Sequence, residues 1–124
     1  MTAATVTGPS FLALQVRDID AAADFYEEQL GLMRAPQSPP GAVVFTTSPV
    51  AFAVRTPLPG TDLSSGQPGL GVALWMAAKN AQELHDRLAA NGVEILTAPF
   101  QGPFGLTFVF RDLDGYAITI HNQD

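Results

Sequence analysis

Histidine, the residue best suited to proton transfer at neutral pH, is scarce in this sequence. The chain has two histidines, His85 and His121. An imidazole is well suited to relaying protons at neutral pH, but neither histidine has an evident partner. We expect His85 at the edge of a helix's apolar stripe, and His121 either near the rim of a cleft or in solvent. Asp112 and Asp114 lie in a tight turn, which accounts for both carboxylates without catalysis.

Nucleophile and phosphate-binding motifs are also missing from the sequence. The chain contains no cysteine, which excludes disulfides, thiolate metal sites and a cysteine nucleophile. No serine stands in a G-x-S-x-G setting, and no glycine-rich loop follows an expected strand. The residues therefore offer no recognisable catalytic constellation.

Aromatic side chains are more informative. Trp75 is the single tryptophan of the chain, and stacking on a flat ligand would add about 0.5–1.5 kcal/mol beyond area burial. We favour a position in a pocket for Trp75 over one in the core. Most of the phenylalanines are expected in the core, where this residue type is usually found.

The first half of the chain predicts the element order β-α-β-β-β. Asp18 has the side chain of a helix N-cap, and Gly31 can end the helix in a left-handed conformation. Between them, apolar residues recur at helical spacing: Ile19, Ala22, Ala23, Tyr26 and Leu30. Strands are expected over 11–16, 32–34, 42–46 and 50–55, followed by a turn-rich linker over 56–68.

The second half predicts the same order. A strand over 70–76 leads to a helix with Asn80 as N-cap and Glu83 completing a capping box. The helix carries an apolar stripe of Ala81, Leu84 and Leu88 and ends at Asn91-Gly92. Strands follow over 93–97, 106–111 and 116–121, the last two joined by a tight turn over 112–115.

The two halves suggest a duplicated module. A shift of 60 positions lays 11–16 over 71–76, so Phe11 falls on Gly71 and Gln15 on Trp75. We expect a single α+β domain over 1–124, with modules over 10–55 and 69–122. One strand face is uniformly aliphatic and should meet the helix. The other face is mixed and could line a cavity, or could meet another sheet or subunit.

Composition and charge exclude several classes of protein. The 124 residues carry a net charge of −6 with six lysines and arginines in total, which argues against nucleic acid as a partner. The N-terminal residues lack the features of a signal peptide, and no apolar run approaches the ~20 residues of a membrane span. We therefore expect a cytoplasmic protein that does not bind membranes.

Three motifs in this order resemble those of the vicinal oxygen chelate superfamily, which includes glyoxalases, extradiol dioxygenases and bleomycin-resistance proteins. They are Val16-Arg17-Asp18-Ile19-Asp20, then Phe25-Tyr26 with Leu30-Gly31, then Asp112-Leu113-Asp114-Gly115-Tyr116. Leu113 departs from the proline usual in the family. The resemblance covers about residues 10 to 122. It implies two βαβββ modules forming an incomplete barrel around a cleft, often completed across a homodimer.

The resemblance also implies where a divalent metal would be held. Enzymes of the family use His and Glu from the first and last strands of each module, and these positions correspond to Phe11, Gly71 and Thr119. The fourth position lies in the strand over 50–55, and no Asp, Glu or His occurs from 29 to 61. Phenylalanine and glycine offer no donor and a neutral hydroxyl is a poor one, so we expect neither metal nor cofactor.

Two main functions remain open. The first is metal-independent binding and sequestration of a hydrophobic or aromatic small molecule, most simply an antibiotic, by a homodimer that resembles the bleomycin-resistance branch. The second is a lyase, isomerase or oxygenase with an altered or absent metal site, and a regulatory or protein-binding module is a third option. We lean towards a protein that is not an enzyme. The residues expected to contact the ligand are Phe11, Gln15, Phe45, Phe52, Trp75, Phe104, Phe108, Thr119 and His121.

Overall fold

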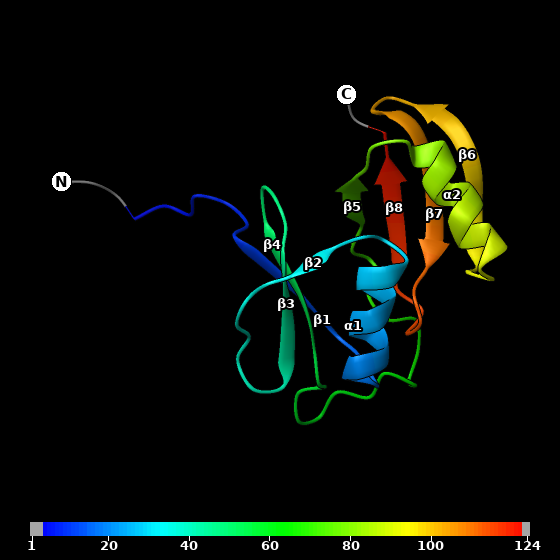
Figure 1. The fold of residues 1–124 in the computed structure, drawn as a ribbon. Coiled ribbons are helices and arrows are strands. Elements are labelled where there is room, and N and C mark those ends of the chain that lie inside the picture. The colour runs from blue at the N-terminus through cyan, green and yellow to red at the C-terminus, as the bar shows by residue number, and fades with distance from the viewer. Residues whose placement is uncertain (1–3, 123–124) are drawn as a thin grey trace.

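The chain folds as two βαβββ modules in the computed structural model, which describes residues 4–122 (Figure 1). The first module comprises β1 (Phe11–Gln15), α1 (Ile19–Glu28), β2 (Met33–Arg34), β3 (Ala42–Thr46) and β4 (Ala51–Arg55). The second comprises β5 (Leu74–Ala77), α2 (Ala81–Ala90), β6 (Ile95–Gly102), β7 (Gly105–Arg111) and β8 (Ala117–His121). This confirms the predicted α+β class and the duplicated element order.

Each module forms its own four-stranded mixed sheet. The strand orders are β1-β4-β3-β2 and β5-β8-β7-β6. In both sheets the first strand of the module runs parallel to its last strand, while the remaining pairs are antiparallel. The two sheets are open and do not close into a barrel (Figure 1). Within residues 4–122, no helix has the length and apolar character needed to span a membrane.

Helix α1 is bounded as the sequence predicts. Asp18 has an extended backbone (φ −128°, ψ 102°), and its carboxylate accepts a hydrogen bond from the amide of Ala21 at 3.1 Å. Gly31 takes a φ of +76°, and its amide donates to the carbonyl of Glu27 at 3.0 Å. Both signals act within one helical turn of the residue that carries them, which is why the local sequence is enough to recognise them.

The predicted capping box of α2 is wrong. Asn80 adopts a left-handed backbone (φ 54°, ψ 58°), and its side chain makes no capping hydrogen bond. A capping side chain needs an extended backbone to reach the amides of the first turn. The Oδ1 atom of Asn122 lies 3.4 Å from the amide of Ala81 instead, so a residue from the other end of the module takes that place.

The predicted strand over 70–76 is only partly correct. Strand β5 begins at Leu74, because Gly69 and Gly71 take φ values of +72° and +88°. These left-handed conformations form a turn that an extended strand cannot contain. The linker between the sheets therefore continues from the predicted turn-rich segment to Ala73. Strand β6 is longer than predicted and runs to Gly102, with irregular pairing to β7 between Ile95 and Phe100.

The structural repeat has a different register from the predicted one. The amide of Val16 donates to the carbonyl of Arg55 at 2.9 Å, and the amide of Ala78 makes the same bond to His121 at 2.9 Å. Val16 and Ala78 are 62 positions apart, as are the first residues of α1 and α2. Phe11 therefore corresponds to Ala73 rather than Gly71. Because both shifts are even, each residue keeps the strand face that the sequence predicts.

The hydrophobic core lies between the sheets and the helices. Tyr26 of α1 packs against Phe45 and Phe52, with ring centroids 6.3 and 5.0 Å away. Phe108 and Phe110 occupy the corresponding face of the second sheet and are fully buried. The helix-facing side of each sheet is thus the apolar side, as the uniform strand face predicts.

A turn with two carboxylates joins the modules. The Tyr26 hydroxyl donates to Oδ2 of Asp112 at 2.6 Å, and Oδ1 of Asp112 accepts from the amides of Asp114 and Tyr116 at 3.0 and 2.9 Å. Oδ1 of Asp114 accepts from the Arg17 amide at 2.8 Å and forms an ion pair with its guanidinium at 3.2 Å. The aspartates of this turn therefore have structural roles, as the sequence suggests.

Burial shifts the pKa values of Asp112 and Tyr26 at this junction. Desolvation raises the pKa of Asp112, although the hydrogen bond from Tyr26 acts in the opposite direction. Burial, together with the nearby Asp112 carboxylate, raises the pKa of Tyr26 well above its usual range. The tyrosine therefore stays protonated and remains a hydrogen-bond donor throughout the physiological range.

Candidate functional site

The structure divides the predicted ligand-contact residues into two groups. Phe45, Phe52 and Phe108 are no more than 3% exposed and lie in the core beside the helices, so they do not line an open surface. This placement corrects the prediction for these three residues. The residues on the open sides of the sheets, or at the ends of their strands, are Phe11, Gln15, Trp75, Phe104, Thr119 and His121.

Three rings gather on the open side of the second sheet. The centroid of Trp75 lies 5.8 Å from that of Phe104 and 5.9 Å from that of His121, while Phe104 and His121 are 6.1 Å apart. We call Trp75, Phe104 and His121 the aromatic patch. Adjacent strands position two of its members, because Trp75 pairs with Thr119 and Ala77 pairs with His121. Phe104 reaches them from the turn between β6 and β7.

The aromatic patch exposes much apolar surface. Trp75 is 46% exposed and Phe104 is 61% exposed. Covering this apolar surface with a ligand would contribute about 25 cal/mol of binding free energy per Å². The Nδ1 atom of His121 is buried and has no hydrogen-bond partner within the described part of the chain. The patch therefore offers ring faces that could stack on a flat molecule.

The open side of the first sheet is different in character. Phe11 begins β1 and is 52% exposed. Ala13 pairs with Ala53 further along the strand, so the middle of this face carries small side chains. Oε1 of Gln15 accepts a hydrogen bond from the Leu58 amide at 2.7 Å, which fixes its side chain at the linker. Phe11 and Gln15 belong to the first sheet and are not part of the aromatic patch.

The positions that the family resemblance assigns to metal ligands can be tested against the structural register. Phe11 is the first, and Ala73 replaces Gly71 as its counterpart in the second module. Thr119 pairs with Trp75 as Ala53 pairs with Ala13, so Ala53 is the fourth position. Two methyl groups, a phenyl ring and a neutral hydroxyl do not make a ligand set for a divalent metal. Within residues 4–122, no group of three or more His, Cys, Asp or Glu side chains is arranged to hold a metal ion.

His85 lies where the sequence places it, at the edge of the α2 stripe. Its side chain is 18% exposed, its Nδ1 lies 3.0 Å from Oδ1 of Asp86, and its ring packs edge-on against Phe108 at 5.3 Å. The hydrogen bond from His85 is the main cause that lowers the pKa of Asp86. This histidine packs between the helix and the sheet and takes no part in the aromatic patch.

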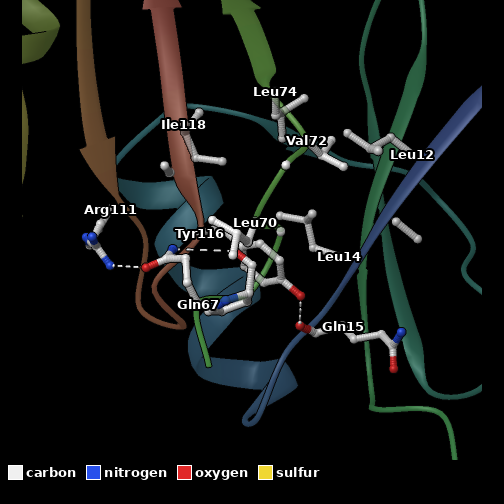
Figure 2. Close-up of a pocket in the computed structure, with 15 residues that line it drawn as sticks. Leu12, Leu14, Gln15, Gln67, Leu70, Val72, Leu74, Arg111, Tyr116 and Ile118 are labelled. Atoms are coloured by element: carbon white, nitrogen blue, oxygen red, sulfur yellow. Dashed lines mark hydrogen bonds between the residues drawn. The ribbon is translucent and has the colours of Figure 1, made fainter. Parts of the chain in front are cut away.

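A cavity of about 720 Å³ lies in the seam between the two sheets. Figure 2 shows β1 on one side of it, with the linker and β8 on the other. We call this cavity the seam pocket. It lies where the chain leaves the predicted strand geometry at Gly69 and Gly71, so no periodic pattern in the sequence marks it.

Comparison with known protein families assigns most of the chain to one superfamily. The family model described as the glyoxalase/bleomycin resistance protein/dioxygenase superfamily matches residues 8–120. Comparison with curated protein sequences finds no match.

Similar solved structures come from several bacteria. An antibiotic binding protein, TnmS3 from Streptomyces sp. CB03234, superposes with a TM-score of 0.75 at 20% identity, covering 98% of this chain and 100% of that one. A protein of unknown function from Agrobacterium tumefaciens gives 0.74 at 22% identity, with 100% and 98% coverage.

A third similar structure is a fosfomycin resistance protein, FosX from Listeria monocytogenes, complexed with Mn(II) and sulfate. It gives a TM-score of 0.74 at 17% identity and covers 97% of this chain and 93% of that one. At these identities the likeness establishes the fold alone, whereas the family model covers most of the sequence. The chain therefore belongs to the glyoxalase/bleomycin resistance protein/dioxygenase superfamily.

Proposed function

We propose that this protein binds an aromatic or hydrophobic small molecule at the aromatic patch and releases it chemically unchanged. The single observation that carries the proposal is the cluster of Trp75, Phe104 and His121, with ring centroids within about 6 Å of one another on an open sheet face. Stacking on such rings contributes about 0.5–1.5 kcal/mol per pair beyond area burial.

The residues at the family's metal positions support binding over metal-dependent catalysis. Phe11, Ala73, Ala53 and Thr119 do not supply the carboxylates and imidazoles that such chemistry requires. An enzyme of the same family would need a different ligand set, and residues 4–122 hold no cluster of three such side chains. We therefore derive no catalytic step for this chain.

The proposal extends to the class of ligand. One similar structure is that of an antibiotic binding protein and another that of a fosfomycin resistance protein. We propose an antibiotic with a flat ring system as the ligand here. Sequestration of such a molecule would protect a cell without altering the drug. We also propose that the protein acts in the cytoplasm.

We also propose that the protein works as a homodimer. Phe11 is 52% exposed and Trp75 is 46% exposed on the open faces of the two sheets. A second copy could cover both faces and turn them into clefts, as the family resemblance implies. Sedimentation at micromolar concentration tests this part: a single species of twice the chain mass supports it, and a monomer at all concentrations contradicts it.

The experiment for binding uses the intrinsic fluorescence of Trp75, the single tryptophan. Protein treated with a chelator and dialysed is titrated with a panel of aromatic antibiotics, and the ligand is then recovered and weighed by mass spectrometry. We expect saturable quenching by at least one compound at micromolar affinity or better, with its mass unchanged. A converted ligand, or a transition metal retained in stoichiometric amount, would contradict the proposal.

A further inference from the structure

The seam pocket is separate from the aromatic patch in both place and chemistry. Its lining includes none of Trp75, Phe104 and His121. Leu12 and Leu14 of β1 form one wall, Leu74 and Ile118 the opposite wall, and Leu70 and Val72 the rim (Figure 2). Its volume of about 720 Å³ is within the usual range for small-molecule sites.

The walls of the seam pocket are aliphatic. Leucine, isoleucine and valine side chains offer dispersion contacts to a flexible chain, and they lack the flat faces that favour ring stacking. Leu70 and Val72 at the rim are 82% and 72% exposed. A molecule lying in the pocket would remove this surface from water, at about 25 cal/mol for each Å² buried.

One end of the seam pocket is polar. The Tyr116 hydroxyl donates to the Gln15 carbonyl at 2.6 Å, and Nη1 of Arg111 donates to Oε1 of Gln67 at 2.6 Å. Dashed lines mark both bonds in Figure 2. Nε of Arg111 is buried without a hydrogen-bond partner among residues 4–122, and it forms a 3.6 Å ion pair with the exposed carboxylate of Glu94. The end of the pocket therefore holds a guanidinium that is 34% exposed and has one long ion pair, to a carboxylate that does not line the pocket.

We propose that the seam pocket binds an aliphatic molecule that ends in an anionic group. The alkyl part lies between the Leu12/Leu14 wall and the Leu74/Ile118 wall, beneath Leu70 and Val72. The anionic group lies at the end that carries Arg111, where a charge-assisted hydrogen bond is stronger than a neutral one. This site is independent of the proposed function, because the two share no residue.

Calorimetric titration with decanoate and with decyltrimethylammonium tests the proposal. Both probes have the same alkyl chain and opposite charge, and the protein's net charge of −6 favours the cation in general. We expect decanoate to bind with 1:1 stoichiometry and at least tenfold more tightly than the cation. Equal affinities, or tighter binding of the cation, would overturn the proposal.

Two sets of variants locate the site. Leu70→Asn and Val72→Asn change exposed rim residues, so the fold should persist, and each should weaken decanoate binding at least fivefold. Arg111→Gln should weaken it by a similar factor, whereas the matched control Arg55→Gln removes the same charge from β4 and should change affinity less than twofold. Equal effects of Arg111→Gln and Arg55→Gln would mean that only overall charge matters, which would overturn the assignment.

The same variants distinguish a ligand from a second protein copy in the seam. Urea unfolding of each variant checks that its fold is retained, and sedimentation measures its self-association. If decanoate fails to bind and Leu70→Asn instead dissociates a dimer, the seam is a protein interface and the proposal is wrong. Binding of aromatic antibiotics to Leu70→Asn at unchanged affinity is expected, because that ligand belongs to the aromatic patch.

Discussion

The hydrogen bond from Tyr26 to Asp112 is a buried polar link between the two modules. Tyr26→Phe removes a fully buried hydroxyl that lies 2.6 Å from Oδ2 of Asp112 and leaves that oxygen without its donor. Hydrogen bonds to charged groups contribute about 1.5–3 kcal/mol. We therefore expect the free energy of unfolding at pH 7 to fall by about 2 kcal/mol. Tyr116→Phe, whose hydroxyl donates to the neutral carbonyl of Gln15, should cost about 1 kcal/mol and serves as the control.

The pH dependence makes this prediction specific. The hydrogen bond from Tyr26 lowers the pKa of Asp112, while burial raises it, so Tyr26→Phe should raise that pKa further. A protonated carboxyl loses less than a carboxylate when this hydrogen-bond donor is removed. The difference in unfolding free energy between wild type and Tyr26→Phe should therefore shrink at acid pH. Urea unfolding monitored by circular dichroism at several pH values measures both quantities. A loss below about 0.5 kcal/mol at pH 7, or one that is the same at acid pH, would refute the reasoning.

Three further substitutions test the fold. Because the pKa of Asp112 is raised in the folded protein, the free energy of unfolding should fall as the pH rises from about 3.9, the pKa of an unfolded aspartate, through the folded pKa. Urea unfolding of Asp112→Asn should therefore show a weaker dependence of stability on pH. Gly105→Ala should lower the unfolding free energy by more than ~1 kcal/mol, because at a φ of +95° the new Cβ would overlap the carbonyl oxygen of Asn122. Asn122→Ala should cost about 0.5–1 kcal/mol through the cap of α2, and no loss on thermal unfolding would contradict that contact.

Local signals in the sequence predict much of the fold. Asp18 and Gly31 bound α1 through contacts within a few residues, and the stripe of Ala81, Leu84 and Leu88 is buried as its spacing requires. Strand alternation also assigns the open face correctly for Trp75, because parity survives an error of two residues in the repeat.

The missed features depend on contacts between distant residues. Asn122 takes the capping place of Asn80 through the amide of Ala81, which is 41 positions away in the sequence, and no local pattern encodes this contact. The side chains of Phe45, Phe52 and Phe108 could face either side of their strands until the pairing register is known, and that register places them in the core. The seam pocket arises from the packing of one module against the other and has no sequence signature.

The central claim is that the aromatic patch binds a flat molecule through Trp75. Calorimetric titration of one aromatic antibiotic into wild type, Trp75→Ala and Leu113→Ala tests it most directly. Leu113 is 60% exposed in the turn before β8 and controls for the loss of an exposed apolar side chain elsewhere. We expect Trp75→Ala to weaken binding about tenfold, which corresponds to ~1.4 kcal/mol of stacking, and Leu113→Ala to leave it unchanged. Equal affinity for wild type and Trp75→Ala would contradict the account.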